Sequence, residues 1–274
     1  MRIIAKALVI AGITTFAGLT GSAIAADAPV HTFTSNVSLV SDYYFRGLSQ
    51  TWHAPALQGG VDYAHANGWY AGLWASNISG NQYAGGSLEV DYYGGYNGKF
   101  NDDWGWTAGV YGYYYPGANA NKIAGSTVNQ SYNTLEWNAG VSYKWVSFKV
   151  STTFGDAFGA SKANGYTSDT SGSTYMDLTA NIPLADDLTL GLHVGQTDVK
   201  ANLSAPLASG ATNPDYTDYK IGLTKTFNGG WNIGLAYAES SNSKYYNGTT
   251  SLNNASEKRD LGEGTFILSA GRSF

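Results

Sequence analysis

Few side chains in this sequence could carry out hydrolysis. Such a site needs a nucleophilic serine, a histidine base and a residue that orients the histidine, and the only histidines are His31, His53, His65 and His193. His53 follows shortly after Ser49, but that spacing gives no hydrogen-bond geometry. The other histidines precede the first expected strand, lie at a turn or point into an expected lumen. The sequence therefore predicts a protein that is not an enzyme.

Metal and cofactor chemistry also lacks a pattern. The chain has no cysteine, which excludes a disulfide framework, a thiolate metal site and thiol catalysis. The sequence contains no paired-histidine spacing, phosphate-binding glycine loop or calcium loop. We therefore expect neither a metal nor a cofactor.

Charged side chains offer a different chemistry, the attraction of ions and small polar solutes inside a channel. They occur at alternate positions of strand-like segments, opposite the apolar residues. The predicted pore-lining residues are Asp42, Arg46, Asp62, Glu89, Asp91, Glu136, Lys149, Asp177, Asp218 and Lys220. Lys144 and His193 share the predicted inward face. Seven acidic and four basic residues in this set predict a weak preference for cations, with Glu89 and Asp91 as the most sensitive pair.

An alternation with a period of two residues positions these side chains. Val37, Leu39, Tyr43 and Phe45 occupy every second position with mostly polar residues between them, which predicts a strand with two different faces. The pattern recurs to the end of the chain and predicts twelve strands. They cover residues 37–45, 57–63, 69–75, 88–96, 104–114, 135–143, 146–154, 176–182, 188–194, 219–223, 231–237 and 266–270.

The connections between these strands alternate in length. Five are short turns, near Asn67, Asp102, Trp145, Asp186 and Gly229, and the six between them are mostly longer and rich in Gly, Ser, Asn and Thr. With an even strand number, this pattern predicts an all-β transmembrane antiparallel barrel with short periplasmic turns and long outer loops. The barrel must close because a sheet edge in lipid leaves backbone groups without partners. A secreted β-sandwich is the alternative fold.

Aromatic residues at the strand ends support a membrane barrel, since such barrels carry an aromatic girdle at each interface. The predicted periplasmic girdle consists of Tyr63, Trp69, Tyr96, Trp104, Tyr143, Phe227 and Trp231. The predicted outer girdle consists of Tyr43, Phe45, Phe154, Tyr237 and Phe266. The last residues, ending at Phe274, resemble the C-terminal signal that outer-membrane barrels present to their assembly machinery, although Arg272 departs from its apolar pattern. That resemblance implies the assembly machinery as a partner.

The composition fits a barrel whose outer surface faces lipid. The chain of 274 residues is 43% hydrophobic and 13% charged, whereas soluble domains contain roughly 25% charged residues. Its 35 glycines argue against a helical protein, and the pI near 5.2 argues against a nucleic-acid partner. Residues 1–25 combine a basic start, an apolar run and a small-residue cleavage site, which predicts a signal peptide before a barrel at 26–274. A membrane anchor is the alternative, but the run is shorter than the ~20 residues that a spanning helix needs.

A specific resemblance begins with the run SDYYFRGLSQT at residues 41–51 and continues through residues 55–65 and 68–77. These segments resemble the TorF-type porins of proteobacteria, and the likeness rests afterwards on strand pattern and length. The resemblance implies an outer-membrane location and a pore, without a particular ligand. The same motif could instead serve assembly, because Gly59, Gly60, Gly68 and Gly72 let strands curve and pack closely.

These observations predict a passive diffusion channel for small hydrophilic solutes or ions in the outer membrane of a Gram-negative bacterium. Its expected surroundings are outer-membrane lipid and lipopolysaccharide. A twelve-stranded barrel lies between small barrels that side chains fill and larger ones that hold an open aqueous channel, so we expect a narrow pore. Two alternatives are a lumen closed by ion pairs and a structural barrel that acts through its outer loops.

Overall fold

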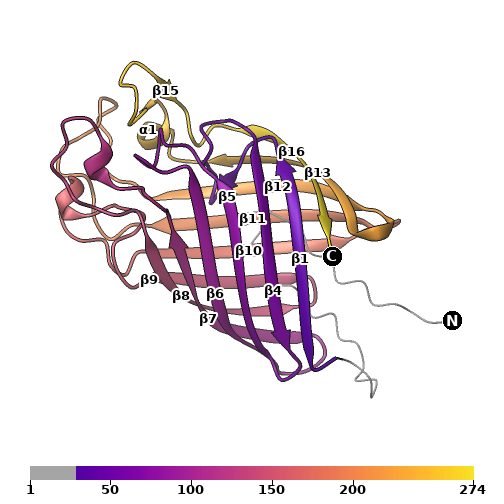
Figure 1. The fold of residues 1–274 in the computed structure, drawn as a ribbon. Coiled ribbons are helices and arrows are strands. Elements are labelled where there is room, and N and C mark those ends of the chain that lie inside the picture. The colour runs from indigo at the N-terminus through magenta and orange to yellow at the C-terminus, as the bar shows by residue number, and fades with distance from the viewer. Residues whose placement is uncertain (1–28) are drawn as a thin grey trace.

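A closed antiparallel β-barrel of twelve strands forms the body of the protein (Figure 1) in the computed structural model, which describes residues 29–274. The barrel strands are β1 (His31–Val40), β4 (Ala56–His65), β5 (Trp69–Asn77), β6 (Leu88–Lys99), β7 (Trp104–Tyr114), β8 (Thr134–Tyr143), β9 (Val146–Thr153), β10 (Thr174–Pro183), β11 (Leu188–Asp198), β12 (Tyr216–Thr226), β13 (Trp231–Ser240) and β16 (Thr265–Ser273). Each strand pairs with its neighbours along the chain, so the expected fold and strand number are confirmed. The predicted signal peptide at 1–25 lies outside the described residues.

The barrel closes between its first and last strands. β1 and β16 pair antiparallel from Asn36 opposite Ser273 to Val40 opposite Ser269. Beyond this ladder, Phe274 and Ser35 exchange two backbone hydrogen bonds of 2.8 and 3.3 Å. Closure thus gives the backbone groups of β1 and β16 the hydrogen-bond partners that they would lack at an open sheet edge.

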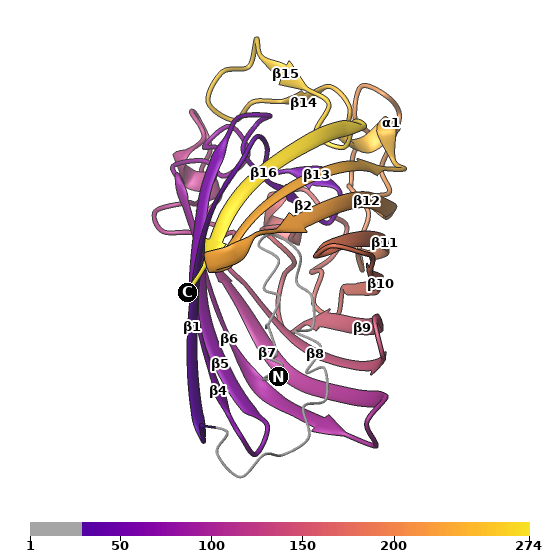
Figure 2. The ribbon, with the colours of Figure 1, turned by 90° about the vertical axis from the view of Figure 1, so that its right-hand side faces the viewer.

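The connections fall on two different ends (Figure 2). One end of the barrel, here called the short-turn end, carries the five tight connections, the start of β1 and the end of β16. The other end, here called the long-loop end, carries the six other connections. Short elements within the long connections are β2 (Tyr44–Phe45), β3 (Leu48–Ser49), β14 (Thr249–Thr250), β15 (Lys258–Arg259), the helix α1 (Ser243–Tyr246) and 3-10 turns at Ala120–Lys122 and Lys162–Asn164. A further 3-10 turn, Asn228–Gly230, belongs to the short-turn end. No helix among residues 29–274 has the length and apolar character needed to cross a membrane.

The two faces of the barrel differ in polarity as the alternation predicts. Leu39, Leu57, Ile221 and Leu268 point outward and are 51 to 62% exposed. At the short-turn end, Trp69, Trp104, Tyr143, Phe227 and Trp231 are also exposed, as expected for a girdle. The opposite face is mostly polar and buried within the barrel. This arrangement is that of a barrel with lipid outside and polar groups inside.

The first strand is shorter than expected. β1 ends at Val40 instead of reaching residue 45, and Tyr43 and Phe45 leave the barrel wall. Tyr43 is 6% exposed and packs on Trp74, with 5.4 Å between the ring centroids. The assignment of Tyr43 and Phe45 to an outer girdle is therefore wrong, whereas Phe154 and Phe266 do point outward. Tyr43 is buried and Phe45 is partly buried against the same aromatic cluster, so both pack inside the protein and do not face lipid.

Candidate functional site in the barrel lumen

The connection between β1 and β4 folds into the barrel instead of away from it. Within it, β2 and β3 form a two-stranded ribbon, here called the lumen hairpin (residues 44–49), which Figure 2 shows between the barrel walls. Its turn residues Arg46 and Gly47 have φ of 48° and 74°, the positive values that a two-residue hairpin turn requires. A Cβ on Gly47 would collide with the Cβ of Asp218 on β12. The hairpin tip therefore lies directly against β12.

Arg46 fixes the tip of the lumen hairpin. Its guanidinium donates to both oxygens of Glu136 on β8, at 3.0 and 2.7 Å, and lies over the ring of Tyr175 on β10, 4.2 Å from the centroid. Phe45 packs on Tyr113 and Phe158 at 5.4 and 5.7 Å between ring centroids. Bidentate pairing of arginine with a carboxylate is strong and directional. These contacts hold the hairpin across the lumen.

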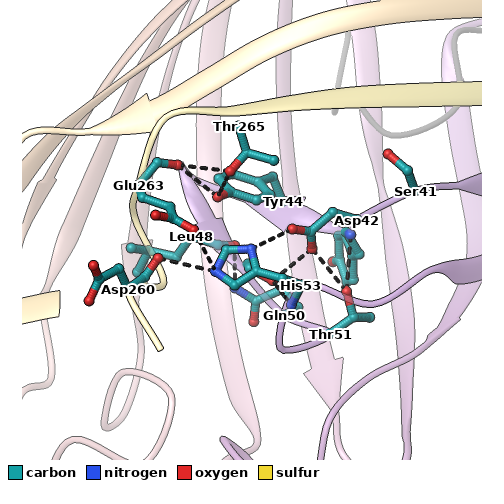
Figure 3. A network of polar contacts seen from close by, with 12 residues as sticks. Ser41, Asp42, Tyr44, Leu48, Gln50, Thr51, His53, Asp260, Glu263 and Thr265 are labelled. Carbon is teal, nitrogen blue, oxygen red and sulfur yellow. Dashed lines mark hydrogen bonds and ion pairs between the residues drawn. The ribbon is translucent and has the colours of Figure 1, made fainter. Parts of the chain in front are cut away.

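The whole connection from β1 to β4, residues 41–55, is here called the inserted segment. Asp42 lies at its base and accepts several of its hydrogen bonds (Figure 3). Its Oδ1 accepts hydrogen bonds from Ser49 Oγ and Thr51 Oγ1, at 2.7 and 3.0 Å, and its Oδ2 lies 2.7 Å from His53 Nδ1. His53 Nε2 lies 3.1 Å from the backbone oxygen of Asp260. The hydrogen bond to Asp42 raises the pKa of His53 above its usual range, against the partial burial that lowers it. His53 thereby joins the inserted segment to the β13–β16 connection.

This cluster does not have the geometry of a hydrolase triad. Ser49 Oγ donates to Asp42 and accepts from the backbone N–H of His53 at 3.0 Å, so it makes no hydrogen bond to the imidazole ring. The ring nitrogen that would act as a base is directed at a backbone carbonyl. A triad needs the serine hydroxyl on that nitrogen. The arrangement therefore fixes a loop and does not activate Ser49.

All ten predicted pore-lining residues are buried or half-buried in the structure. Five of the carboxylates accept a hydrogen bond from a tyrosine hydroxyl. The pairs are Tyr93 with Asp62, Tyr111 with Asp91, Tyr115 with Glu89, Tyr113 with Glu136, and Tyr175 with Asp218. These tyrosines were not among the predicted site residues. Their positions on the inward parity of β6, of β7 and the residue directly after it, and of β10 are the signal that could have identified them.

Burial changes the expected role of Glu89 and Asp91. They are 1% and 2% exposed, because Tyr115 and Tyr111 cover them. Asp62 is only half-buried. Asp62 is therefore more accessible than the pair that was expected to be most sensitive.

The basic residues divide into bound and free groups. His193 lies between two carboxylates, with Nε2 2.9 Å from Asp218 Oδ1 and Nδ1 3.5 Å from Asp177 Oδ1. Within residues 29–274, Lys149 and Lys220 make no hydrogen bond or ion pair. The inward placement of Lys144 is wrong, because it lies in the β8–β9 turn with φ of 50° and pairs with Asp103 at 3.7 Å. The turn interrupts the strand alternation on which that placement depended.

Glycines on the inner wall make room for tyrosine rings. A Cβ on Gly72 would collide with the ring of Tyr93, and one on Gly195 would collide with Tyr175. The rings consequently lie along the wall instead of filling the centre. Tyr93 and Tyr111 are stacked with 5.0 Å between centroids and an interplanar angle of 7°. Part of the glycine content thus serves the shape of the lumen.

A cavity of about 60 Å³, here called the inner cavity, lies between the connection from β1 to β4 and the wall formed by β10, β11, β12, β13 and β16. Tyr44, Gln58, Asn181, His193 and Lys220 are among its lining residues. In the part of the chain that the structure describes, no group of three or more His, Cys, Asp or Glu side chains could hold a metal ion.

The fold and the polar inner face define a closed twelve-stranded transmembrane barrel with a partly filled lumen. The chain belongs to the family described as "Bacterial protein of unknown function (Gcw_chp)", whose model matches residues 23–274. No curated relative matches the sequence.

Solved porin structures share the fold at low sequence identity. The chain is similar to the NanC porin, with a TM-score of 0.54 and 12% identity over 88% of this chain and 99% of that chain. It is similar to the KdgM porin, with a TM-score of 0.51 and 8% identity over 88% of this chain and 98% of that chain. A KdgM porin in complex with disordered oligogalacturonate gives 0.50 and 8%, over 89% and 99%. The likeness concerns the fold.

Proposed function

We propose that this protein is an outer-membrane diffusion channel for small hydrophilic solutes, narrowed by the lumen hairpin. The observation that carries the proposal is the closed barrel with apolar side chains outside and polar side chains inside. Resemblance to TorF-type porins and a fold shared with the NanC and KdgM porins support it. The short-turn end would then face the periplasm and the long-loop end the exterior, among lipopolysaccharide.

Delivery and assembly belong to the same proposal. Residues 1–25 act as a cleaved signal peptide, so an intact mass beginning at Ala26 is expected. The assembly machinery recognises the last strand. Arg272 fits the interface there, since its Nε donates to the Gly229 oxygen and its guanidinium lies over Trp231 and Phe274. A mass that retained residues 1–25 would contradict the export route.

The charge inside the barrel supports a weak preference for cations. Lys144 lies in the β8–β9 turn and does not count as a lumen charge. The seven predicted inward carboxylates therefore outnumber the three remaining Arg and Lys residues, which are Arg46, Lys149 and Lys220. An acidic lumen with low-dielectric walls concentrates cations. In a potassium chloride gradient across a planar bilayer, the zero-current potential should favour potassium. Asp62→Asn should reduce that preference more than Glu89→Gln, and a chloride-selective pore would overturn it.

A non-conducting barrel that acts through its outer loops is the second candidate. The observation that favours it is the buried pair of Arg46 and Glu136, which holds the hairpin across the lumen. Reconstitution of folded protein in a planar bilayer distinguishes the two functions. Discrete conductance steps support the channel, and their absence from heat-modifiable, folded protein supports the structural role.

A further inference from the structure

The inner cavity is large enough for a small organic molecule. Its volume is about 60 Å³, and a buried water needs roughly 10–15 Å³ by this measure, so about four to six waters fit. Tyr44 covers it from the inserted segment, and Gly191 and Lys220 line it from β11 and β12. A solute entering the lumen would therefore meet a bounded space beside the hairpin.

The charged side chains that line the inner cavity differ in whether they have an ion-pair partner. Asp42 is paired with His53 at 2.7 Å, and His193 is held between Asp177 and Asp218. Lys220 lines the cavity, yet within residues 29–274 its ammonium group has no hydrogen bond or ion pair. Asp218 precedes it on the same strand face, but that carboxylate accepts from Tyr175 and contacts His193. Within residues 29–274, Lys220 is thus the cavity-lining charged residue whose side chain makes neither a hydrogen bond nor an ion pair.

Two buried amide oxygens in the cavity also lack partners. Gln58 Oε1 and Asn181 Oδ1 are buried without a hydrogen bond, and both residues line the inner cavity. The orientation of Gln58 is set because its Nε2 donates to Ser76 Oγ at 3.4 Å. Unpartnered buried acceptors are costly, and a ligand hydroxyl group would satisfy them.

We propose that the inner cavity binds a small hydroxycarboxylate. The ammonium of Lys220 holds the carboxylate, and the unpartnered amide oxygens of Gln58 and Asn181 are the acceptors available for a hydrogen bond from the hydroxyl group of the solute. This inference rests on the proposed function and names the class of solute for the channel. It is compatible with a weak preference for free cations, because the ammonium acts at contact range whereas the summed charge acts on ions throughout the lumen.

Lactate is a suitable probe because two close analogues isolate its groups. Propionate lacks the hydroxyl, and propane-1,2-diol carries a neutral group in place of the carboxylate. A ligand-detected NMR titration of the folded full-length barrel in non-ionic detergent should give saturable lactate binding, with Kd on the order of 1 mM. Both analogues should bind at least about fivefold more weakly, since each loses a hydrogen-bonding group. Propionate binding as tight as lactate would overturn the proposed class.

Substitutions locate the site. Lys220→Gln should weaken lactate binding at least about tenfold, whereas Lys149→Gln removes the same charge from a lumen position outside the cavity and should change Kd less than about twofold. Gly191→Val provides a second test, because a Cβ there meets only Asn181 Oδ1 at 3.6 Å and Gly222 O at 3.8 Å. It should fill the cavity and weaken binding without removing charge.

The outcomes separate this inference from the proposed function. Equal losses in the two lysine variants, or no saturable binding by the folded wild-type protein, would overturn the binding site. Saturable binding with the expected variant pattern supports the site even if the barrel shows no conductance, in which case only the channel function fails. Conductance steps without lactate binding leave the channel supported and reject the site.

Discussion

Arg46 and Glu136 meet inside the barrel although they are 90 residues apart in the chain, with Arg46 Nη2 2.7 Å from Glu136 Oε2. Both side chains are largely buried, at 9% and 2% exposure. A hairpin on the β1–β4 connection is thereby attached to the opposite wall. The pair holds the hairpin across the lumen.

Removing the carboxylate of this pair should loosen the hairpin. Glu136→Gln leaves the guanidinium of Arg46 buried without a counter-ion, which typically costs about 3–5 kcal/mol in unfolding free energy. We expect a lower unfolding midpoint in a denaturant titration and a larger single-channel conductance. Asp103→Asn is the control, since it breaks the exposed pair with Lys144 and should cost less than about 1 kcal/mol. Equal effects of the two substitutions would contradict the role given to Arg46.

Gly47 is expected to tolerate no side chain. Gly47→Ala places a Cβ against the Cβ of Asp218 at a residue with φ of 74°, so the hairpin must move away from β12. Gly125→Ala is the matched control, because Gly125 has φ of 79° and nothing within 4 Å of the added atom. Backbone strain alone should cost about 1–2 kcal/mol in both variants. Only Gly47→Ala should also change the conductance, and a change in both would argue against a steric contact at the tip.

The anchoring of the inserted segment should depend on pH through His53. Because the folded pKa of His53 is raised, its stabilising contribution is complete below the unfolded value of about 6.5 and is lost as pH rises through the folded value. The conductance should therefore rise or become noisier on the alkaline side. His53→Gln should remove that dependence while Glu136→Gln retains it. An unchanged pH profile in His53→Gln would assign the effect to another group.

The last residue should matter for assembly through its backbone. Phe274 exchanges two hydrogen bonds with Ser35, and these complete the seam between β16 and β1. Deletion of Phe274 should lower the amount of folded protein in the outer membrane severalfold without lowering synthesis. Phe274→Ala keeps the two backbone hydrogen bonds to Ser35 but removes the aromatic ring. This variant therefore distinguishes the contribution of the seam from that of the C-terminal aromatic residue. Membrane levels of the truncated protein equal to wild type would refute the prediction.

The barrel itself could be predicted because its alternation is imposed locally by lipid on one side and the lumen on the other. Leu57, Leu73 and Leu235 all follow that rule, as do the inward carboxylates. The position of the β1–β4 connection inside the barrel could not be predicted from the alternation. Tyr43 and Phe45 continue the phase of Val37 and Leu39, although they pack inside the protein. The alternation does not distinguish burial in lipid from burial in a lumen.

One local signal for the hairpin was present in the sequence. Arg46-Gly47 stands between two short segments and could form a two-residue turn. The partners of that turn, Glu136 and Tyr175, lie on strands far along the chain. Contacts across a lumen depend on barrel size and stagger, which the strand pattern does not contain. The same limit applies to the unpartnered ammonium of Lys220.

The central claim is that this barrel conducts and that the lumen hairpin narrows it. The most direct test compares single-channel conductance of the wild-type protein with a variant in which residues 44–49 are replaced by Gly-Gly, after heat-modifiable migration has shown that both are folded. Small, discrete steps for the wild type and steps at least about twofold larger for the variant are predicted, because a wider lumen carries more current. Equal conductance in the two proteins, or no conductance from either folded barrel, would contradict the claim.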